Sequence, residues 1–126
     1  MNIIDSSCWL EYFAGTPLAD VIGTIVENTD DLLVPSIVLF EVFKKLMVEV
    51  GEDKAIMAIA HLKQGHIVEL DGDSAIFSAK IGKEYNLALA DSIIYATTLK
   101  YNATLYTQDH HFEKLRNVIY YKKKIS

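Results

Sequence analysis

The most informative stretch of the sequence comes in two runs, which read Ala-Leu-Ala-Asp91-Ser-Ile-Ile-Tyr and Ala103-Thr-Leu-Tyr-Thr107-Gln-Asp109-His-His-Phe112. The first run has the pattern of a helix over about residues 89–101, and the second begins as a short apolar strand over 103–107. An aspartate lies near the start of the helix, and another follows the strand. In open parallel sheets, functional side chains gather beyond the carboxyl ends of the strands. The residues that follow every other strand therefore become candidates as well.

Strands and helices alternate along the rest of the chain. We expect strands at 2–5, 32–34, 66–70, 103–107 and 118–121, and helices at about 8–13, 17–28, 35–50, 53–64, 74–85 and 89–101. Several of the strands are continuous apolar runs, which suit parallel strands buried on both faces. Helices between parallel strands form right-handed crossovers that cover the sheet. The sequence therefore predicts a single domain over 1–126, an α/β/α sandwich of three layers with a central, mainly parallel sheet of four to five strands.

Composition excludes several classes of protein. The 126 residues are 51% hydrophobic and 23% charged, which is close to a globular average and unlike disordered, collagen-like or coiled-coil chains. The single cysteine, Cys8, excludes an intrachain disulfide and a zinc site built from several cysteines. No run approaches the ~20 apolar residues of a membrane span, and no basic region precedes the first apolar residues. We therefore expect a cytoplasmic protein that does not enter the membrane.

Charge is unevenly spread along the chain. The net charge is −5, and residues 1–43 contain no Lys or Arg, whereas a lysine run stands at 122–124. An acidic balance argues weakly against nucleic-acid binding, because phosphates are neutralised by basic side chains. A divalent cation between carboxylates and phosphates removes that objection. An enzyme that acts on phosphates through a metal ion therefore remains open.

Four acids stand at positions where they could share one edge of the sheet. Asp5 ends the first strand, Asp109 follows the fourth, Asp91 lies near the start of a helix, and Glu41 lies inside the helix over 35–50. Carboxylates in one cleft raise each other's pKa unless a cation neutralises them. Mg²⁺ and Mn²⁺ prefer oxygen ligands, and such a centre can activate water against a phosphodiester. The pattern therefore predicts a site for Mg²⁺ or Mn²⁺.

Each acid also has a simpler interpretation. Asp5 and Asp91 are placed to cap helices, and Asp109 could form a turn with its own backbone. Glu41 could pair with Lys45 on the surface of its helix. Against that pairing, the turn before Glu41 is apolar on every side, and a buried carboxylate is costly without a partner or a metal. The joint placement of the four acids carries more weight than any one of them.

Two further motifs stay open. His110-His111 could indicate a transition metal, but adjacent residues rarely reach one ion and the sequence offers no evident third ligand, which favours a solvated turn. Tyr120-Tyr121 and the lysines at 122–124 could form a frayed tail, or could stack on single-stranded RNA and contact its phosphates.

The sequence resembles a PIN domain of the VapC toxin type, along essentially its whole length. The resemblance rests on Ile-Ile-Asp5-Ser-Ser7, on Pro35-Ser36-Ile-Val-Leu-Phe-Glu41 and on the two runs quoted above. It implies a ribonuclease dependent on Mg²⁺ or Mn²⁺ that leaves a 5′-phosphate and a 3′-hydroxyl. It also implies a homodimer and an antitoxin protein whose tail covers the cleft.

The same resemblance assigns roles to individual residues. Asp5, Glu41, Asp91 and Asp109 match the acidic quartet of the family, and Ser7 and Thr107 match its small hydroxyl positions. Asp5 and Asp91 would be the inner metal ligands. Glu41 would bind the metal directly or through water, or orient the attacking water. Ser7 and Thr107 would help to hold a water or a carboxylate.

Three other functions compete with this reading. One is a PIN fold without catalytic activity that acts only as a binding module. Another is a phosphoacceptor receiver domain, which would need a pair of acids after the first strand, whereas Asp5 stands alone. The third is a structure-specific DNA nuclease, although such chains are usually longer.

Overall fold

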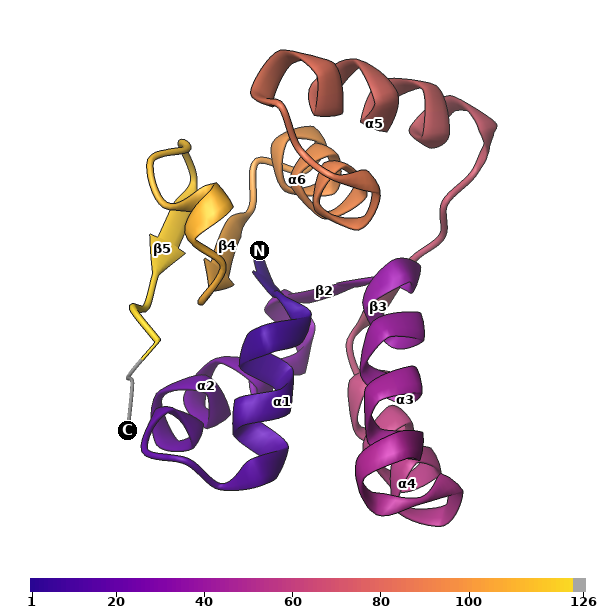
Figure 1. Ribbon diagram of the computed structural model, residues 1–126, viewed down its shortest axis with the longest axis vertical. Coiled ribbons are helices and arrows are strands. Elements are labelled where there is room, and N and C mark those ends of the chain that lie inside the picture. The colour runs from indigo at the N-terminus through magenta and orange to yellow at the C-terminus, as the bar shows by residue number, and fades with distance from the viewer. Residues whose placement is uncertain (124–126) are drawn as a thin grey trace.

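The computed structural model describes residues 1–123. This part of the chain forms five strands and six α-helices, and a pair of helices connects each of the first three strands to the next (Figure 1). The strands are β1 (Asn2–Ile4), β2 (Leu32–Pro35), β3 (His66–Val68), β4 (Thr104–Thr107) and β5 (Val118–Tyr120). The helices are α1 (Ser6–Ala14), α2 (Leu18–Val26), α3 (Ser36–Val50), α4 (Glu52–Leu62), α5 (Gly72–Tyr85) and α6 (Leu89–Lys100). Short 3₁₀ turns occur at η1 (Thr29–Asp31) and η2 (His110–Phe112).

The sheet confirms the predicted fold class and is parallel throughout. Its order is β3-β2-β1-β4-β5, with Ile3 opposite Leu33 on one side and Leu105 on the other. The chain steps from β1 outward to β3, then returns to β4 on the other side of β1. Right-handed crossovers place α1 to α4 on one face and α5 and α6 on the other. Figure 1 shows the strands between these two groups of helices.

The predicted elements are all present, and most of the differences are at their ends. The first helix begins at Ser6 rather than at about residue 8, because the side chain of Asp5 caps it. The strand expected over 66–70 ends at Val68, and the helix that follows begins at Gly72 with Asp71 as its cap. The helix expected over 17–28 ends at Val26, and η1 leads from there into β2.

The core lies on both faces of the sheet, and Trp9, Tyr95 and Phe112 are its largest fully buried side chains. Helices α5 and α6 pack closely where Gly82 faces Ser92, because a Cβ at Gly82 would overlap with the Ser92 hydroxyl. This close approach fixes the start of α6, which carries Asp91. None of the helices in the described part of the chain is long and apolar enough to cross a bilayer.

Candidate active site

The four acids singled out by the sequence meet at the carboxyl ends of β1 and β4. These two strands are neighbours, with Ile4 opposite Tyr106, yet their connections run to opposite sides of the sheet. Parallel sheets bind ligands at such a switch point. Asp5 directly follows β1, and Asp109 lies two residues after β4. Glu41 comes from α3 on one face, and Asp91 comes from the first turn of α6 on the other.

Asp5 is the most buried of the four, with 5% of its surface exposed. Its Oδ1 accepts a hydrogen bond from the backbone N–H of Ser6 at 2.8 Å. Its Oδ2 accepts from the hydroxyls of Thr107 at 2.6 Å and Ser7 at 3.2 Å. Burial raises the pKa of Asp5 to about 6, and the charges of Glu41 and Asp109 add to the rise, while the bonds from Thr107 and Ser6 oppose it. Asp5 is thus both a helix cap and a buried carboxylate.

Asp91 is partly buried and is surrounded by the other acids. Burial raises its pKa well above the usual range, and the charges of Asp109, Asp5 and Glu41 raise it further. Interaction with the Asp109 side chain also favours the protonated form of Asp91. The backbone cap of α6 is Ala88, so capping does not account for Asp91. Its position is explained by the acidic cluster instead.

Glu41 is held by a residue that sequence reasoning did not single out. The hydroxyl of Ser6 donates to Glu41 Oε1 at 2.5 Å, linking α1 to α3. The alternative interpretation, a surface pair with Lys45, is not borne out, and Lys45 pairs with Glu49 at 3.3 Å instead. The adjacent serines of the Asp-Ser-Ser motif therefore bind different acids. Ser6 holds Glu41, and Ser7 holds Asp5.

Thr107 and Ser7 connect the two strand ends. The Thr107 hydroxyl, which is fully buried, donates to Asp5 and accepts from the backbone N–H of Asp109 at 2.9 Å. The Ser7 hydroxyl accepts from the backbone N–H of Gln108 at 3.2 Å. Gln108 therefore contributes its backbone N–H to the hydrogen-bond network between the two strand ends. This network fixes Asp5 and the loop carrying Asp109 relative to each other.

The donor set fits a hard divalent cation. It consists of carboxylate oxygens, the ligands that Mg²⁺ and Mn²⁺ prefer. Within residues 1–123, no Lys or Arg forms an ion pair with any of the four acids. No three of the four acids have ligand atoms within 4.8 Å of one another, so water ligands would complete the coordination of an ion. Asp5, Asp91, Glu41 and Asp109 are the residues that would hold it.

Comparison with known proteins identifies the family. The family model of the PIN domain matches residues 3–118. The chain belongs to the PIN domain family. PIN domains are typically nucleases that use divalent metal ions. A search of curated proteins by sequence found no match.

Solved structures share this PIN fold at low sequence identity. A toxin–antitoxin complex from Klebsiella pneumoniae superposes with a TM-score of 0.77 at 22% identity, covering 94% of this chain and 96% of that chain. VapBC2 from Rickettsia felis, bound to a DNA fragment from its promoter, gives 0.72 at 16% identity, covering 95% and 96%. VapC20 from Mycobacterium tuberculosis, a toxin that cleaves the sarcin–ricin loop, gives 0.73 at 16% identity, covering 90% and 93%.

The two open motifs also find places in the PIN fold. Tyr120 is the last residue of β5, and the backbone N–H of Tyr121 donates to the Thr107 carbonyl at 2.8 Å, so neither tyrosine belongs to a frayed tail. Lys124 lies outside the described residues. His110 and His111 are exposed and begin η2 directly after Asp109.

Proposed function

We propose that this PIN domain is an endoribonuclease dependent on Mg²⁺ or Mn²⁺, and that it is the toxin of a toxin–antitoxin pair. The observation that carries the proposal is the placement of four carboxylates at one switch point, with two of them raised in pKa by burial and by their acidic neighbours. Repulsion between the ionised carboxylates of such a cluster destabilises the fold at neutral pH, and a bound cation neutralises their charge. The similarity to toxin structures supports the choice of RNA as substrate and of an antitoxin as partner.

The cleavage chemistry divides among the four acids and their hydroxyl partners. A bound Mg²⁺ or Mn²⁺ supplies polarisation of a phosphoryl oxygen and lowers the pKa of water. Asp5 and Asp91 would hold the ion, and Thr107 and Ser7 keep Asp5 in its orientation. Glu41, fixed by Ser6, is placed to bind the ion or to orient the attacking water. Hydrolysis then leaves a 5′-phosphate and a 3′-hydroxyl.

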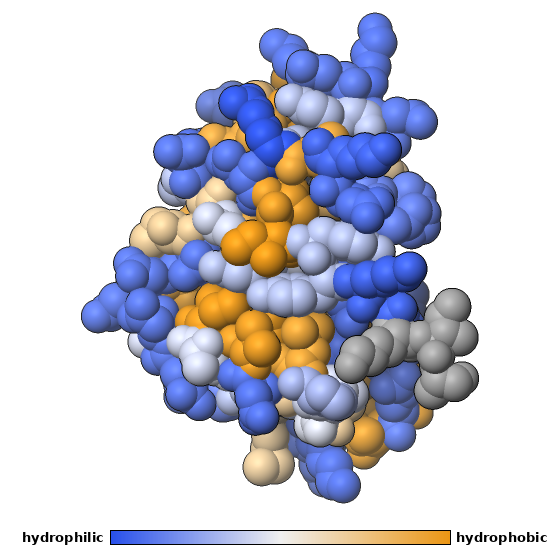
Figure 2. Space-filling model, turned by 90° about the vertical axis from the view of Figure 1, so that its left-hand side faces the viewer, coloured by the Kyte–Doolittle hydropathy of each residue, from blue (hydrophilic) through white to orange (hydrophobic). Residues whose placement is uncertain are grey.

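RNA reaches this centre along the groove between β5 and α2. The groove has a volume of about 670 Å³, and Gln108, Tyr120, Tyr121, Lys122 and Lys123 line one side of it. Figure 2 views the molecule from the side of β5 and α2, where apolar and weakly polar side chains occupy the middle of the face between hydrophilic borders. Tyrosine rings can stack on bases, and the lysines can neutralise phosphates. Gln108 joins the groove to the strand end that carries Asp109.

The antitoxin has a separate apolar groove to occupy. A groove of about 590 Å³ runs between α1, α3 and α4 and is lined mainly by apolar side chains, among them Leu10, Phe13, Leu46, Val50 and Met57. An amphipathic helix that lays its apolar face into such a groove is a common mode of recognition. Met57 is 73% exposed without a partner, so covering it stabilises the complex.

The homodimer uses the opposite layer. Ile76 on α5 and Leu89 at the start of α6 are exposed, at 64% and 79%. A second copy of the chain covers these side chains. Sedimentation of the parent and of Leu89→Lys tests this, because burying a charged side chain in the contact is costly and should shift the protein to monomers.

A cleavage assay on total cellular RNA tests the activity. Purified protein is incubated with Mg²⁺, Mn²⁺ or EDTA, and the product ends are mapped. Asp5→Asn should abolish cleavage, because the amide carries no charge to hold the ion. The fold should be kept, because Asn is also a good cap for α1. Asp71→Asn is the matched control, since Asp71 caps α5 from an exposed position through Ser74 at 2.8 Å. A parallel incubation with single-stranded and duplex DNA tests the DNA nuclease alternative.

Discrete fragments with 5′-phosphates that depend on metal and on Asp5 would establish the ribonuclease. Cleavage that survives both EDTA and Asp5→Asn would refute the metal centre. No cleavage of any substrate by folded, antitoxin-free protein would favour the binding module. Replacing Lys122 and Lys123 together by alanine should raise KM and leave kcat near the parent value, if the groove binds RNA outside the reacting centre.

A further inference from the structure

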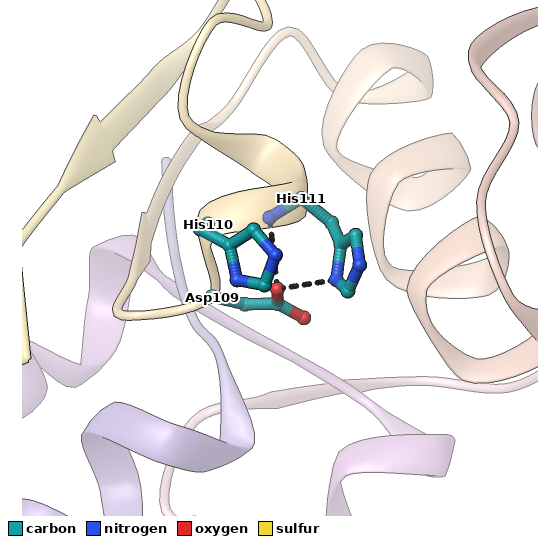
Figure 3. Close-up of side chains that lie close together, drawn as sticks. All are labelled: Asp109, His110 and His111. Carbon is teal, nitrogen blue, oxygen red and sulfur yellow. Dashed lines mark hydrogen bonds and ion pairs between the residues drawn. The ribbon is translucent and has the colours of Figure 1, made fainter.

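The turn that follows β4 brings together three side chains of a different chemistry from the acidic cluster. Asp109, His110 and His111 place one ligand atom each within 4.8 Å of one another. Within residues 1–123 this is the one group of three His, Cys, Asp or Glu residues that does so. Figure 3 shows the two imidazole rings beside the Asp109 carboxylate.

The local backbone explains why adjacent residues converge here. Asp109 caps η2, and its Oδ1 accepts from the backbone N–H of His111 at 2.9 Å. The Nδ1 atom of His111 lies 2.8 Å from the same oxygen. The centroids of the His110 and His111 rings are 4.2 Å apart, so both rings stay on one side of the turn. The sequence offered no third ligand for the histidine pair, and the structure supplies Asp109.

The donor set matches a borderline transition metal rather than a hard cation. Two imidazole nitrogens and one carboxylate oxygen form a common ligand set for Zn²⁺, with a fourth position left for water. His110 and His111 are exposed, so an ion reaches them without opening the fold. Ligation through His111 Nδ1 would replace its 2.8 Å contact with Asp109 Oδ1 by contacts of both atoms with the ion.

We propose that Asp109, His110 and His111 bind Zn²⁺, and that this ion withdraws Asp109 from the acidic centre. Asp109 belongs to both sets, because it follows β4 next to the end of β1, and the Thr107 hydroxyl that accepts from its backbone N–H also donates to Asp5. An ion held on the histidine side fixes the Asp109 carboxylate there and competes with its use by Mg²⁺ or Mn²⁺. Zn²⁺ therefore inhibits the nuclease, and this consequence rests on the proposed function, whereas the binding itself does not.

Calorimetric titration of Zn²⁺ into tag-free, metal-free protein tests the binding. The parent should bind Zn²⁺, and part of the measured binding should depend on His110 and His111. Replacing both His110 and His111 by alanine should weaken that component by about tenfold or more, a loss on the scale seen when groups around a metal are removed. His66→Ala is the matched control, because His66 is also exposed but begins β3 at the far edge of the sheet. Equal Zn²⁺ affinity in the parent and the double variant would overturn the site.

Inhibition is measured separately, with each variant's cleavage rate compared with its own rate without Zn²⁺. At fixed Mg²⁺, added Zn²⁺ should slow the parent and the His66→Ala protein, and the double variant should resist. Inhibition that persists undiminished after the histidine component of binding is lost would overturn the competition for Asp109. If the protein cleaves no RNA, the proposed function fails, and the calorimetric comparison still decides whether the site binds Zn²⁺.

Discussion

Metal-free protein should lose stability as the pH rises through the acid range, because of Asp5. Most carboxylates stabilise a fold when they ionise, since the folded state lowers their pKa. Asp5 behaves in the opposite way, because burial raises its pKa from 3.8 to about 6. Asp91 is raised as well, for the same reason and through its acidic neighbours.

The sign follows from proton binding. Between the unfolded pKa near 4 and the folded pKa, the folded chain holds a proton on Asp5 that the unfolded chain has released. The stabilisation is therefore complete below about pH 4 and is lost as the pH rises past about 6. A gap of roughly two pKa units corresponds to about 3 kcal/mol of unfolding free energy. Asp5 is almost fully buried, so little of this is screened by solvent.

The assay is urea denaturation in EDTA at several pH values, comparing the parent with Asp5→Asn. Asn keeps the cap of α1 and removes the ionisation, while every exposed acid remains common to both proteins. The stability of Asp5→Asn relative to the parent should therefore increase by about 3 kcal/mol between about pH 4 and about pH 7. At neutral pH, Mg²⁺ should raise the unfolding free energy of the parent. The increase should be about 2.7 kcal/mol at a Mg²⁺ concentration 100 times Kd.

Two results would refute the reasoning. A difference between the two proteins that stays constant with pH would mean that burial does not hold Asp5 protonated. A gain from Mg²⁺ that is as large in Asp5→Asn as in the parent would mean that the ion binds away from the acidic cluster.

Three other substitutions test the supporting structure. Thr107→Val removes the hydroxyl that links the two strand ends, and single-turnover assays should show cleavage slower by about 10–100-fold in a protein that still folds. Gly82→Ala forces α5 away from α6 and should cost about 1–3 kcal/mol in urea denaturation, whereas Gly72→Ala, which meets nothing within 4 Å, should cost much less. Tyr95→Phe removes the hydrogen bond to the Arg116 carbonyl at 2.9 Å and should lower the unfolding free energy by about 1 kcal/mol, measured in the same way.

The fold could be predicted because local signals agree with the global arrangement. Apolar runs such as Ile3-Ile4 and Leu32–Val34 are buried on both sides, as parallel strands require. Helix ends could be placed only within a few residues, because their positions depend on which polar side chain caps the backbone. Asp5 rather than Ser6 or Ser7 caps α1, and the helix therefore starts two residues earlier than expected.

The acids of the candidate site could be predicted from the sequence. Their hydrogen-bond partners could be predicted much less well. Asp5 and Asp109 follow strands, and position alone brings them to one edge. The choice between Ser6 and Ser7 as the partner of Glu41 depends on how the first turn of α1 is rotated, and successive residues point about 100° apart on a helix. The convergence of His111 on Asp109 depends on a side-chain rotamer in a 3₁₀ turn, which no sequence pattern specifies. The catalytic roles of the four acids stay a prediction until cleavage is measured.

The acidic centre is assembled only when both helical layers are docked on the sheet. Asp5 and Asp109 come from neighbouring strand ends, Glu41 from α3 on one face, and Asp91 from α6 on the other. No single element contributes two of the acids, so a partly folded chain offers an ion only part of the site. Metal binding is therefore linked to complete folding, and the ion should raise the global unfolding free energy rather than stabilise one segment. Repulsion among the acids lowers the free energy of unfolding most in the metal-free protein. The effect of Asp5 ionisation on stability should therefore be measured without metal.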